Sequence, residues 1–354
     1  MAYPKIEVDL SKIKHNTATL VKLCNKYGIR VAGVTKVFCG NAEIARAYLD
    51  GGVSYLADSR IENLIKLKDF KVPKILLRLP MISEAERVVE YTDISLNSEL
   101  ATIKALSKAA KEKERNHKII LMFDLGDLRE GYFKEEDLFT DIEEILKLEN
   151  VEVIGLGTNL TCYGGVIPSE ENLGRLVNLA KKIEEDYRLK LEIISGGNSS
   201  TLHMLIDGKK LEGINQLRLG ESIVLGRETA FGNRIENTHD DAFQLVVEII
   251  EIKDKPSVPV GEIGMDAFGK VPTFEDRGIR KRIICAIGKQ DIDFDSILPM
   301  DEGIKILGGS SDHLILDGTE SNIDYKVGDE IRFKLTYGGI LRAMTSEYVK
   351  KVIR

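Results

Sequence analysis

The sequence predicts an α/β protein: a closed (β/α)8 barrel of parallel strands followed by a smaller all-β domain. Two observations lead to this prediction. Short apolar runs alternate with helical periods from Val31 to about Gly226, and after Gly232 short β-branched runs are separated by Gly, Pro and Asp. The chain has 354 residues, of which 43% are apolar. It can therefore bury the cores of one large and one small domain.

The barrel strands are expected where the apolar runs are nearly continuous, as in parallel sheets covered by helices. These runs are Val31–Thr35, Val53–Ala57, Lys74–Leu79, Thr92–Leu96, Lys118–Phe123, Val151–Thr158, Leu191–Ile194 and Asn215–Leu217. Eight strand–helix units favour closure into a TIM-type barrel over an open sheet.

Helix starts are expected between these strands. Ser59 precedes Glu62 by three residues, which is the spacing of a capping box. Ser169 precedes an acidic first turn. The helix after Ser169 is expected to pack on the sheet through an apolar stripe formed by Leu173, Leu176, Val177 and Ala180.

Four segments are expected. Residues 1–10 contain a strand run, Ile6–Leu10, without a helix of its own, which we expect to join the β domain. Residues 11–232 form the barrel, the polar stretch 233–241 is a linker, and residues 242–354 form the β domain. Its strands are predicted at Phe243–Ile252, Ile279–Ile287, Ile304–Leu307, Leu314–Leu316 and Glu330–Leu335.

Composition and charge argue against several classes of protein. A net charge of −7 with interspersed signs, and the absence of tryptophan, argue against nucleic-acid binding. No apolar run reaches transmembrane length, and the N-terminus lacks a secretory signal, so we expect a cytoplasmic protein without membrane association. Four separated cysteines without a C-x-x-C motif and five scattered histidines predict reduced thiols and no metal site.

Polar residues follow the ends of the predicted barrel strands. They are Lys36, Asp58-Ser-Arg60, Arg78, Asn97, Asp124, Asn159, Ser195 and Arg218. In a (β/α)8 barrel the carboxyl ends of the strands carry the active site. A helix cap or a strand-end salt bridge is the alternative for any one of these residues, and for Asp58, Ser59 and Asn97 it is an equally good explanation. Their recurrence after all eight strands favours an active site on this rim.

Lys36 and two glycine-containing turns indicate the kind of ligand. A lysine ending an apolar strand either extends to solvent or serves chemistry, because burying its charge is costly. Ser195-Gly-Gly-Asn-Ser-Ser200 and Arg218-Leu-Gly-Glu-Ser222 can offer hydroxyl and N–H donors to a phosphate, although a plain turn also explains the glycines. A phosphate site opposite a strand-end lysine suggests pyridoxal phosphate (PLP) with its aldehyde on Lys36.

These motifs resemble the alanine racemase family of PLP enzymes over essentially the whole chain. The resemblance rests on Lys36, Asp124-Leu-Gly-Asp-Leu-Arg129-Glu-Gly, Asn198-Ser199, Arg218-x-Gly220 and the following β domain. Within the family, the sequence is most similar to the branch that racemises ornithine. That similarity is carried by Asp58-Ser-Arg60, Asn159-Leu-Thr-Cys-Tyr-Gly164, Gly226-Arg-Glu-Thr-Ala230 and Gly261-Glu-Ile-Gly-Met-Asp-Ala-Phe-Gly269.

The resemblance implies a role for each matching residue. Lys36 would form the aldimine with PLP and exchange the Cα proton on one face. Arg129 would approach the phenolic oxygen of the cofactor, and Arg218 would face its ring nitrogen. The remaining cofactor contacts would come from Asn159, Asn198, Ser199, Ser200, Gly220, Glu221 and Tyr337. Asn159 stands where alanine racemases have a histidine beside the ring.

The base on the opposite face is left open by the resemblance. Alanine racemases place a tyrosine on the β domain, and Lys289 stands at that position here. Lys289 is equally explained as a solvated loop residue. Asp312, Cys162 or a single base working on both faces are the alternatives.

The implied activity is interconversion of L- and D-ornithine by removal and return of the Cα proton. Glu262, Asp266, Asp312 and Asp127 are available to bind a distal ammonium. Lysine or alanine as substrate, a PLP lyase of the same fold, and a non-catalytic PLP-binding homeostasis protein are the alternatives. The resemblance also implies a head-to-tail homodimer in which the β domain completes the neighbouring site.

Overall fold

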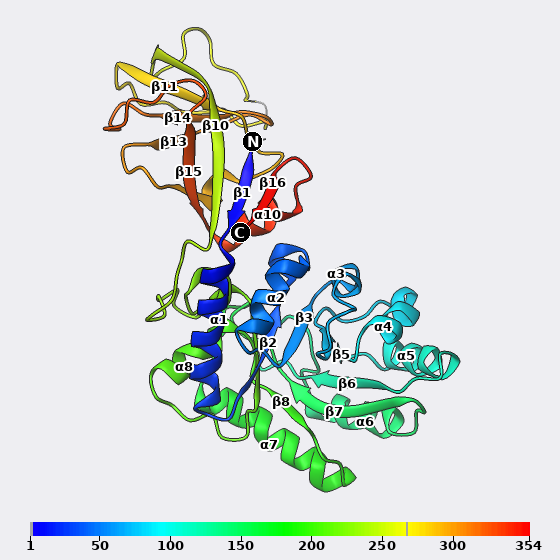
Figure 1. The fold of residues 1–354 in the computed structure, drawn as a ribbon. Helices are drawn as coiled ribbons and strands as arrows, with labels where there is room; N and C mark the ends of the chain where they lie inside the picture. The colour runs from blue at the N-terminus through cyan, green and yellow to red at the C-terminus, as the bar shows by residue number, and fades with distance from the viewer. Residues whose placement is uncertain (1–2, 267) are drawn as a thin grey trace. The chain divides into compact units, whose positions relative to one another are not determined.

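The computed structural model describes residues 3–266 and 268–354. Met1, Ala2 and Ala267 lie outside the described residues, and they fall within the expected N-terminal segment and one string of the β domain. The chain divides into two compact units (Figure 1). One unit is Leu10–Asp240, and the other combines the segment before Leu10 with Asp241–Arg354.

All residues of Leu10–Asp240 are described, and they form a closed barrel of eight parallel strands, β2 to β9 (Figure 1). The strands are β2 (Arg30–Val34), β3 (Tyr55–Asp58), β4 (Lys74–Leu76), β5 (Ile94–Asn97), β6 (His117–Met122), β7 (Val151–Gly157), β8 (Ile193–Ser195) and β9 (Gln216–Leu219). Pairing of β2 with β9, with Val31 opposite Leu217, closes the ring. The predicted barrel is confirmed.

The apolar side chains inside the barrel follow the two-residue period of the strands. Ala32 and Val34 of β2 belong to one buried cluster with Tyr55 and Ala57 of β3. The cluster also contains Ile75, Ile94, Leu96, Ile120, Met122, Ile154 and Ile193. Each large aliphatic side chain buried in this way contributes roughly 1.5–3 kcal/mol to stability. Strand β9 differs, because its alternate residues Gln216 and Arg218 are polar and buried.

Helices connect the barrel strands. They are α1 (Leu10–Asn25), α2 (Ala42–Asp50), α3 (Ile61–Lys66), α4 (Ala85–Tyr91), α5 (Leu100–Glu112), α6 (Glu135–Ile145), α7 (Glu170–Tyr187), α8 (Leu202–Ile206) and α9 (Glu221–Leu225), with short 3-10 turns η1 (Lys36–Phe38), η2 (Ile82–Glu84) and η3 (Ser199–Thr201). The predicted stripe of α7 is buried. Across the described ranges, no helix has both the length and the apolarity needed to cross a membrane.

The helix starts show where local patterns hold and where they fail. Ser169 and Asn172 form a reciprocal capping box on α7. The box predicted at Ser59 is wrong, because Arg60 is the N-cap of α3 and its side chain makes no cap. The buried carboxylate of Asp58 accepts from the Arg60 N–H at 2.9 Å instead. A competing acceptor one residue away has displaced the expected cap.

The second unit is built on a mainly antiparallel sheet. Its strands are β1 (Lys5–Val8), β10 (Phe243–Pro256), β11 (Ile279–Cys285), β12 (Ile297–Pro299), β13 (Lys305–Gly309), β14 (Leu314–Asp317), β15 (Glu330–Leu335) and β16 (Lys350–Ile353), with the turn η4 (Phe294–Ser296) and helix α10 (Tyr337–Thr345). The N-terminal strand β1 pairs antiparallel with β10 and parallel with β16. The predicted β domain is confirmed, although β12, β16 and α10 were not anticipated from the sequence.

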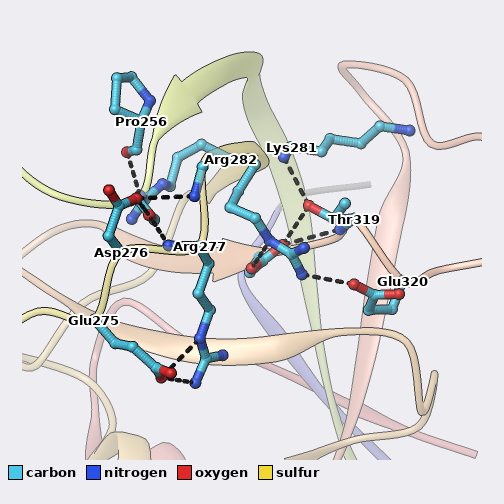
Figure 2. A network of polar contacts seen from close by, with 12 residues as sticks. Pro256, Glu275, Asp276, Arg277, Lys281, Arg282, Thr319 and Glu320 are labelled. Atoms are coloured by element: carbon cyan, nitrogen blue, oxygen red, sulfur yellow. Dashed lines mark hydrogen bonds and ion pairs between the residues drawn. The ribbon is translucent and has the colours of Figure 1, made fainter.

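A long connection, 257–278, joins β10 to β11, and polar contacts hold its ends (Figure 2). Arg282 donates to the carbonyl of Pro256 at 3.2 Å, across the strand pair. Near the other end, Arg277 pairs with Glu275 at 2.5 Å. These contacts anchor a segment that carries several exposed apolar side chains, among them Met265 and Phe268.

A buried histidine links two strands of the barrel. His117, at the start of β6, is 1% exposed, and its Nε2 lies 2.8 Å from the hydroxyl of Ser95 in β5. Asn97 donates to the same hydroxyl at 2.9 Å. Burial lowers the pKa of His117 to about 4, and the nearby charge of Arg115 acts in the same direction.

This burial predicts a pH dependence of stability. Because the folded pKa lies below the unfolded value of about 6.5, the contribution of neutral His117 is complete above pH 6.5 and is lost as the pH falls toward 4. We expect the free energy of unfolding to fall by up to about 3 kcal/mol over this range. Denaturant titrations between pH 4 and 7 measure it.

The variant His117→Gln should flatten this part of the pH profile, since glutamine retains a hydrogen-bonding group near Ser95 but does not titrate. His313→Gln, at an exposed position, is the matched control and should leave the profile unchanged. An unaltered profile in His117→Gln would contradict the assignment.

Candidate active site

Lys36 lies just beyond the carboxyl end of β2, where the strand passes into the turn η1. Cys39 has a left-handed backbone (φ 55°) and is followed by Gly40 (φ 62°), so the chain reverses direction before α2 begins. Lys36 is half-buried, and its ammonium makes no hydrogen bond or ion pair with any described residue. The amine is therefore available for covalent chemistry.

Asp58 fixes the turn that carries Lys36. Its buried carboxylate accepts from the hydroxyl of Thr35 at 2.6 Å and from the side-chain amide of Asn63 at 3.1 Å. Burial raises the pKa of Asp58, while these hydrogen bonds and the charge of Lys36 act in the opposite direction. Gly40 packs so closely that an added Cβ would lie 2.8 Å from the carbonyl oxygen of Asn63. The turn is thus held by buried polar contacts on both sides of Lys36.

Arg218 is the buried cation of the rim. It is 4% exposed, and its guanidinium donates to the hydroxyl of Ser195 at 2.5 Å and to the carbonyl of Thr158 at 2.6 Å. Burial lowers its pKa to about 10, with a smaller contribution in the same direction from the charge of Arg129. Arg218 therefore stays charged at neutral pH and acts only as a hydrogen-bond donor.

The turn after β8 forms a cradle of polar groups. Gly197 has φ +103°, and the side chain of Asn198 accepts from the N–H of Ser200 at 2.8 Å. The hydroxyl of Ser199 accepts from the N–H of Ser222 at 3.2 Å. Within the described chain, the buried hydroxyls of Ser200 and Thr158 have no hydrogen-bond partner. Unpartnered buried hydroxyls are rare and indicate a missing ligand or water.

Arg129 lies on the connection after β6. Its guanidinium pairs with Glu130 and donates from Nη1 to the sulfur of Cys162 at 2.6 Å. The amide of Asn159 lies 3.0 Å from that of Asn198, and with its oxygen turned toward Arg129 it accepts two hydrogen bonds of 2.9 Å. The turns after β6, β7 and β8 are therefore connected side chain to side chain.

The candidate residues of the barrel occupy one continuous arc of its rim. Arg129, Asn159 and Asn198 follow β6, β7 and β8, Arg218 lies within β9, and Lys36 follows β2. These five strands are consecutive around the closed barrel. Ser199 and Ser200 lie on the β8 turn, and Gly220 and Glu221 follow β9. Strand order thus gathers residues spread over almost two hundred positions of sequence.

Other strand-end residues have structural roles. Arg78 pairs with Glu84 at 3.1 Å, and Asn97 bonds back to its own strand through Ser95. The carboxylate of Asp124 accepts from backbone N–H groups of its own turn. The side chain of Glu221 pairs with Arg227 at 2.6 Å, which leaves the Glu221 backbone as the group that can contact a ligand.

The candidate bases of the second unit lie on neighbouring segments of that unit. The backbone N–H of Lys289 donates to the carbonyl of Ser310 at 3.0 Å, two residues before Asp312. The ammonium of Lys289 lies 3.9 Å from the ring centroid of Phe268 and 5.8 Å from that of Phe294. Lys289 is thus exposed, but its ammonium also makes cation–π contacts with aromatic rings.

The other predicted residues of this unit differ in their surroundings. Tyr337 is half-buried and is the first residue of α10. Glu262 and Asp266 are exposed on the connection between β10 and β11. Backbone N–H groups of Lys270 and Phe268 hold the pKa of Asp266 below its usual value. Asp312 is exposed and accepts from the hydroxyl of Ser311 at 2.7 Å.

Sequence reasoning missed three residues that shape the site: Thr35, Thr158 and Ser222. Thr35 and Thr158 directly follow strands, so the strand-end rule could have included them. Ser222 lies within Arg218-Leu-Gly-Glu-Ser222, but its contact with Ser199 depends on the pairing of β8 with β9. Among the residues the structure describes, no group of three or more His, Cys, Asp or Glu side chains could hold a metal ion.

The comparisons with known proteins agree with this architecture. Residues 8–228 match the family model described as "Alanine racemase, N-terminal domain". A solved structure of alanine racemase from Bartonella henselae, described as having covalently bound pyridoxal phosphate, superposes with a TM-score of 0.75 at 16% identity and covers 100% of each chain. At that identity the likeness concerns the fold.

Two curated relatives match over nearly their whole length. An ornithine racemase of Acetoanaerobium sticklandii is 53% identical over 349 residues, covering 99% of this chain and 99% of its own. A lysine racemase of Thermotoga maritima is 43% identical over 354 residues, with 99% of both chains covered. Taken with the family match, these identities show that the chain belongs to the alanine racemase family.

Proposed function

We propose that this enzyme interconverts L- and D-ornithine with pyridoxal 5'-phosphate as its cofactor. The supporting observation is the 53% identity to a protein named ornithine racemase, against 43% to one named lysine racemase, each across 99% of this chain. Lysine, which also carries a distal ammonium, is the second candidate substrate. An alanine racemase relative matches only 51% of this chain, which makes alanine a weaker candidate. Because the full-length matches include the second unit, a barrel-only PLP carrier is a poorer description.

The donor groups of the rim fit a phosphorylated cofactor. The buried hydroxyl of Ser200 has no partner among the described residues and can donate to a ligand. An added Cβ at Gly220 would approach the Cβ of Val34 to 3.1 Å, so a larger residue fits poorly at this position. We assign the phosphate to Asn198, Ser199, Ser200, Gly220 and the backbone of Glu221, the ring face to Asn159, the phenolic oxygen to Arg129 and the ring nitrogen to Arg218.

Lys36 is the residue that holds the cofactor and moves a proton. When bound, PLP supplies an electron sink for the electron pair that remains on Cα when its proton leaves. With the substrate bound, the amine of Lys36 removes and returns the Cα proton on one face. Thr35 and Asp58 keep the turn of Lys36 fixed while this happens.

Arg218 favours racemisation over competing reactions. Its guanidinium remains protonated at neutral pH, since its pKa is lowered only to about 10. It can donate a hydrogen bond to the ring nitrogen without transferring a proton, and the electron sink is therefore weaker than it would be beside an acid. A weaker sink favours prompt return of the proton to Cα over loss of the amine.

Racemisation needs a proton donor on the opposite face of Cα as well. We propose that the second unit of a partner subunit supplies it, through Lys289 or Asp312, in a head-to-tail homodimer. Cys162, which is exposed and hydrogen-bonded to Arg129, is the candidate within the barrel. The substrate's distal ammonium would then meet an acid such as Glu262 or Asp266.

Deuterium exchange tests the reaction. Purified protein loaded with PLP is incubated with L-ornithine in deuterium oxide, while optical rotation and the Cα proton are followed. We expect rotation to decay to zero with Cα deuteration and no new product. Parallel reactions with L-lysine and L-alanine rank the substrates. Exchange without loss of rotation, or faster reaction with lysine, would contradict the ornithine assignment.

Borohydride reduction tests Lys36. We expect reduction of the loaded protein to fix the cofactor on the peptide that contains Lys36. Lys36→Ala should lose this label and roughly a thousandfold of racemase activity, because it lacks both the attachment point and one base. Lys26→Ala, at an exposed position on the barrel, is the control and should retain both. A label on another lysine in the unaltered protein would rule the assignment out.

Mixing two variants tests the second base and the dimer together. If Lys289 serves one face, Lys289→Ala should slow removal of the Cα proton from one enantiomer of ornithine far more than from the other. If Lys289 acts on the neighbouring barrel, a mixed dimer of Lys36→Ala and Lys289→Ala contains one intact site. Re-association of equal amounts should therefore restore about a quarter of normal activity. Unchanged proton removal from both enantiomers in Lys289→Ala would leave Asp312 and Cys162 as candidates.

A further inference from the structure

Asp127 joins two connections of the barrel rim. It lies between β6 and α6, on the connection that carries Arg129, and it is fully buried. Its contacts reach the connection between β7 and α7, which carries Asn159 and Cys162. These two connections lie beside each other because β6 pairs with β7.

The carboxylate of Asp127 binds only backbone groups of the neighbouring connection. One oxygen accepts from the N–H of Tyr163 at 2.9 Å and that of Cys162 at 3.2 Å, and the other accepts from the N–H of Val166 at 3.0 Å. The carbonyl of Asp127 accepts from the N–H of Gly164 at 3.0 Å. A buried carboxylate that accepts several N–H bonds organises the segment that supplies them.

The same contacts exclude another role for Asp127. Its side chain is 0% exposed and both carboxylate oxygens are occupied, so it cannot receive the distal ammonium of a substrate. The sequence had offered it as one of four acids for that purpose. The structure removes it from that group and leaves Glu262, Asp266 and Asp312.

The segment that Asp127 fixes supports the Arg129 guanidinium. Cys162 donates its backbone N–H to Asp127 and receives the guanidinium of Arg129 on its sulfur at 2.6 Å. On its own connection, Arg129 follows Leu128, which has a left-handed backbone (φ 56°) and an N–H bound by Asp124. Arg129 is therefore constrained from both connections, and Asp127 is the link between them.

We propose that Asp127 is a positioning residue of the racemase, which acts through Cys162 and the neighbouring backbone to hold Arg129 in place. This inference rests on the proposed function, in which Arg129 faces the phenolic oxygen of the cofactor. Because Arg129 is assigned to the cofactor, its misplacement changes cofactor binding and turnover more than substrate binding.

The test compares Asp127→Asn with a matched control. Asparagine keeps the shape but replaces one acceptor oxygen by a donor that faces backbone N–H groups. The control is Asp301→Asn in the second unit, where the carboxylate also accepts a backbone N–H, from Gly303 at 2.9 Å. The reaction of protein thiols with a chromogenic disulfide is followed over time. The kinetic phase that is missing in Cys162→Ala is assigned to Cys162.

Four readouts are expected to change in Asp127→Asn and to stay unchanged in Asp301→Asn. Cys162 should react several-fold faster, because its backbone is released. The affinity for PLP should fall and the absorbance of the bound cofactor should shift. The kcat for ornithine should fall by roughly 10- to 100-fold, the loss expected when a reacting geometry is misplaced, with KM changed much less.

The outcomes separate this proposal from the proposed function. Unchanged Cys162 reactivity, or faster Cys162 reaction with unchanged PLP affinity and kcat, would overturn the positioning role. If the unaltered protein does not racemise ornithine, the proposed function fails, while thiol reactivity and PLP binding still decide the role of Asp127. If Asp127→Asn does not fold, Gly164→Ala replaces it, since its Cβ would lie 2.7 Å from the Asp127 carbonyl oxygen and would force the connections apart.

Discussion

The pairing of β2 with β9 is the constraint on which the rest of the site depends. It joins the first and last barrel strands, with Arg30 opposite Gln216, and turns a parallel sheet into a ring. Only in a closed ring does Lys36, at the first strand, become a neighbour of Arg218, at the last. An open sheet with the same strands would leave the amine at one edge and the phosphate cradle at the other.

Charge is distributed unevenly along this arc. Lys36, Arg129 and Arg218 bring three cations to one arc of the rim, where Arg129 is paired with Glu130, whereas Asp58 is buried next to the Lys36 turn. An anionic ligand therefore gains attraction from several directions when it enters the arc. Burial of Arg218 strengthens its hydrogen bonds, because water does not compete for its donors. Burial and the neighbouring charge of Arg129 lower the pKa of Arg218, yet Arg218 keeps its proton at neutral pH.

The sequence predicted the barrel well and the details of the site unevenly, for physical reasons. Strands buried on both faces leave continuous apolar runs, and the strand ends direct attention to Lys36 and Arg218. The helix α10 was not predicted, because Gly338 and Gly339 weaken its helical pattern. The contacts of Asp127 could not be predicted from the sequence, because their donors are backbone N–H groups about 35 residues away. Every residue type except proline has such a group, so no sequence pattern marks it. The aromatic contact of Lys289 depends on how a long connection folds, which a local pattern cannot reveal.

The N-terminal strand gives the chain an unusual order of assembly. Strand β1 is made before the barrel, yet its two partners, β10 and β16, are made after it. During synthesis, Leu10–Asp240 can emerge and close its ring while β1 remains a strand with both edges unpaired. Unpaired edges invite wrong partners, so the short length of β1 and its charged Lys5 and Glu7 protect the nascent chain. The barrel can thus complete its ring while β1, which belongs to the other unit, stays unpaired until β10 and β16 have been made.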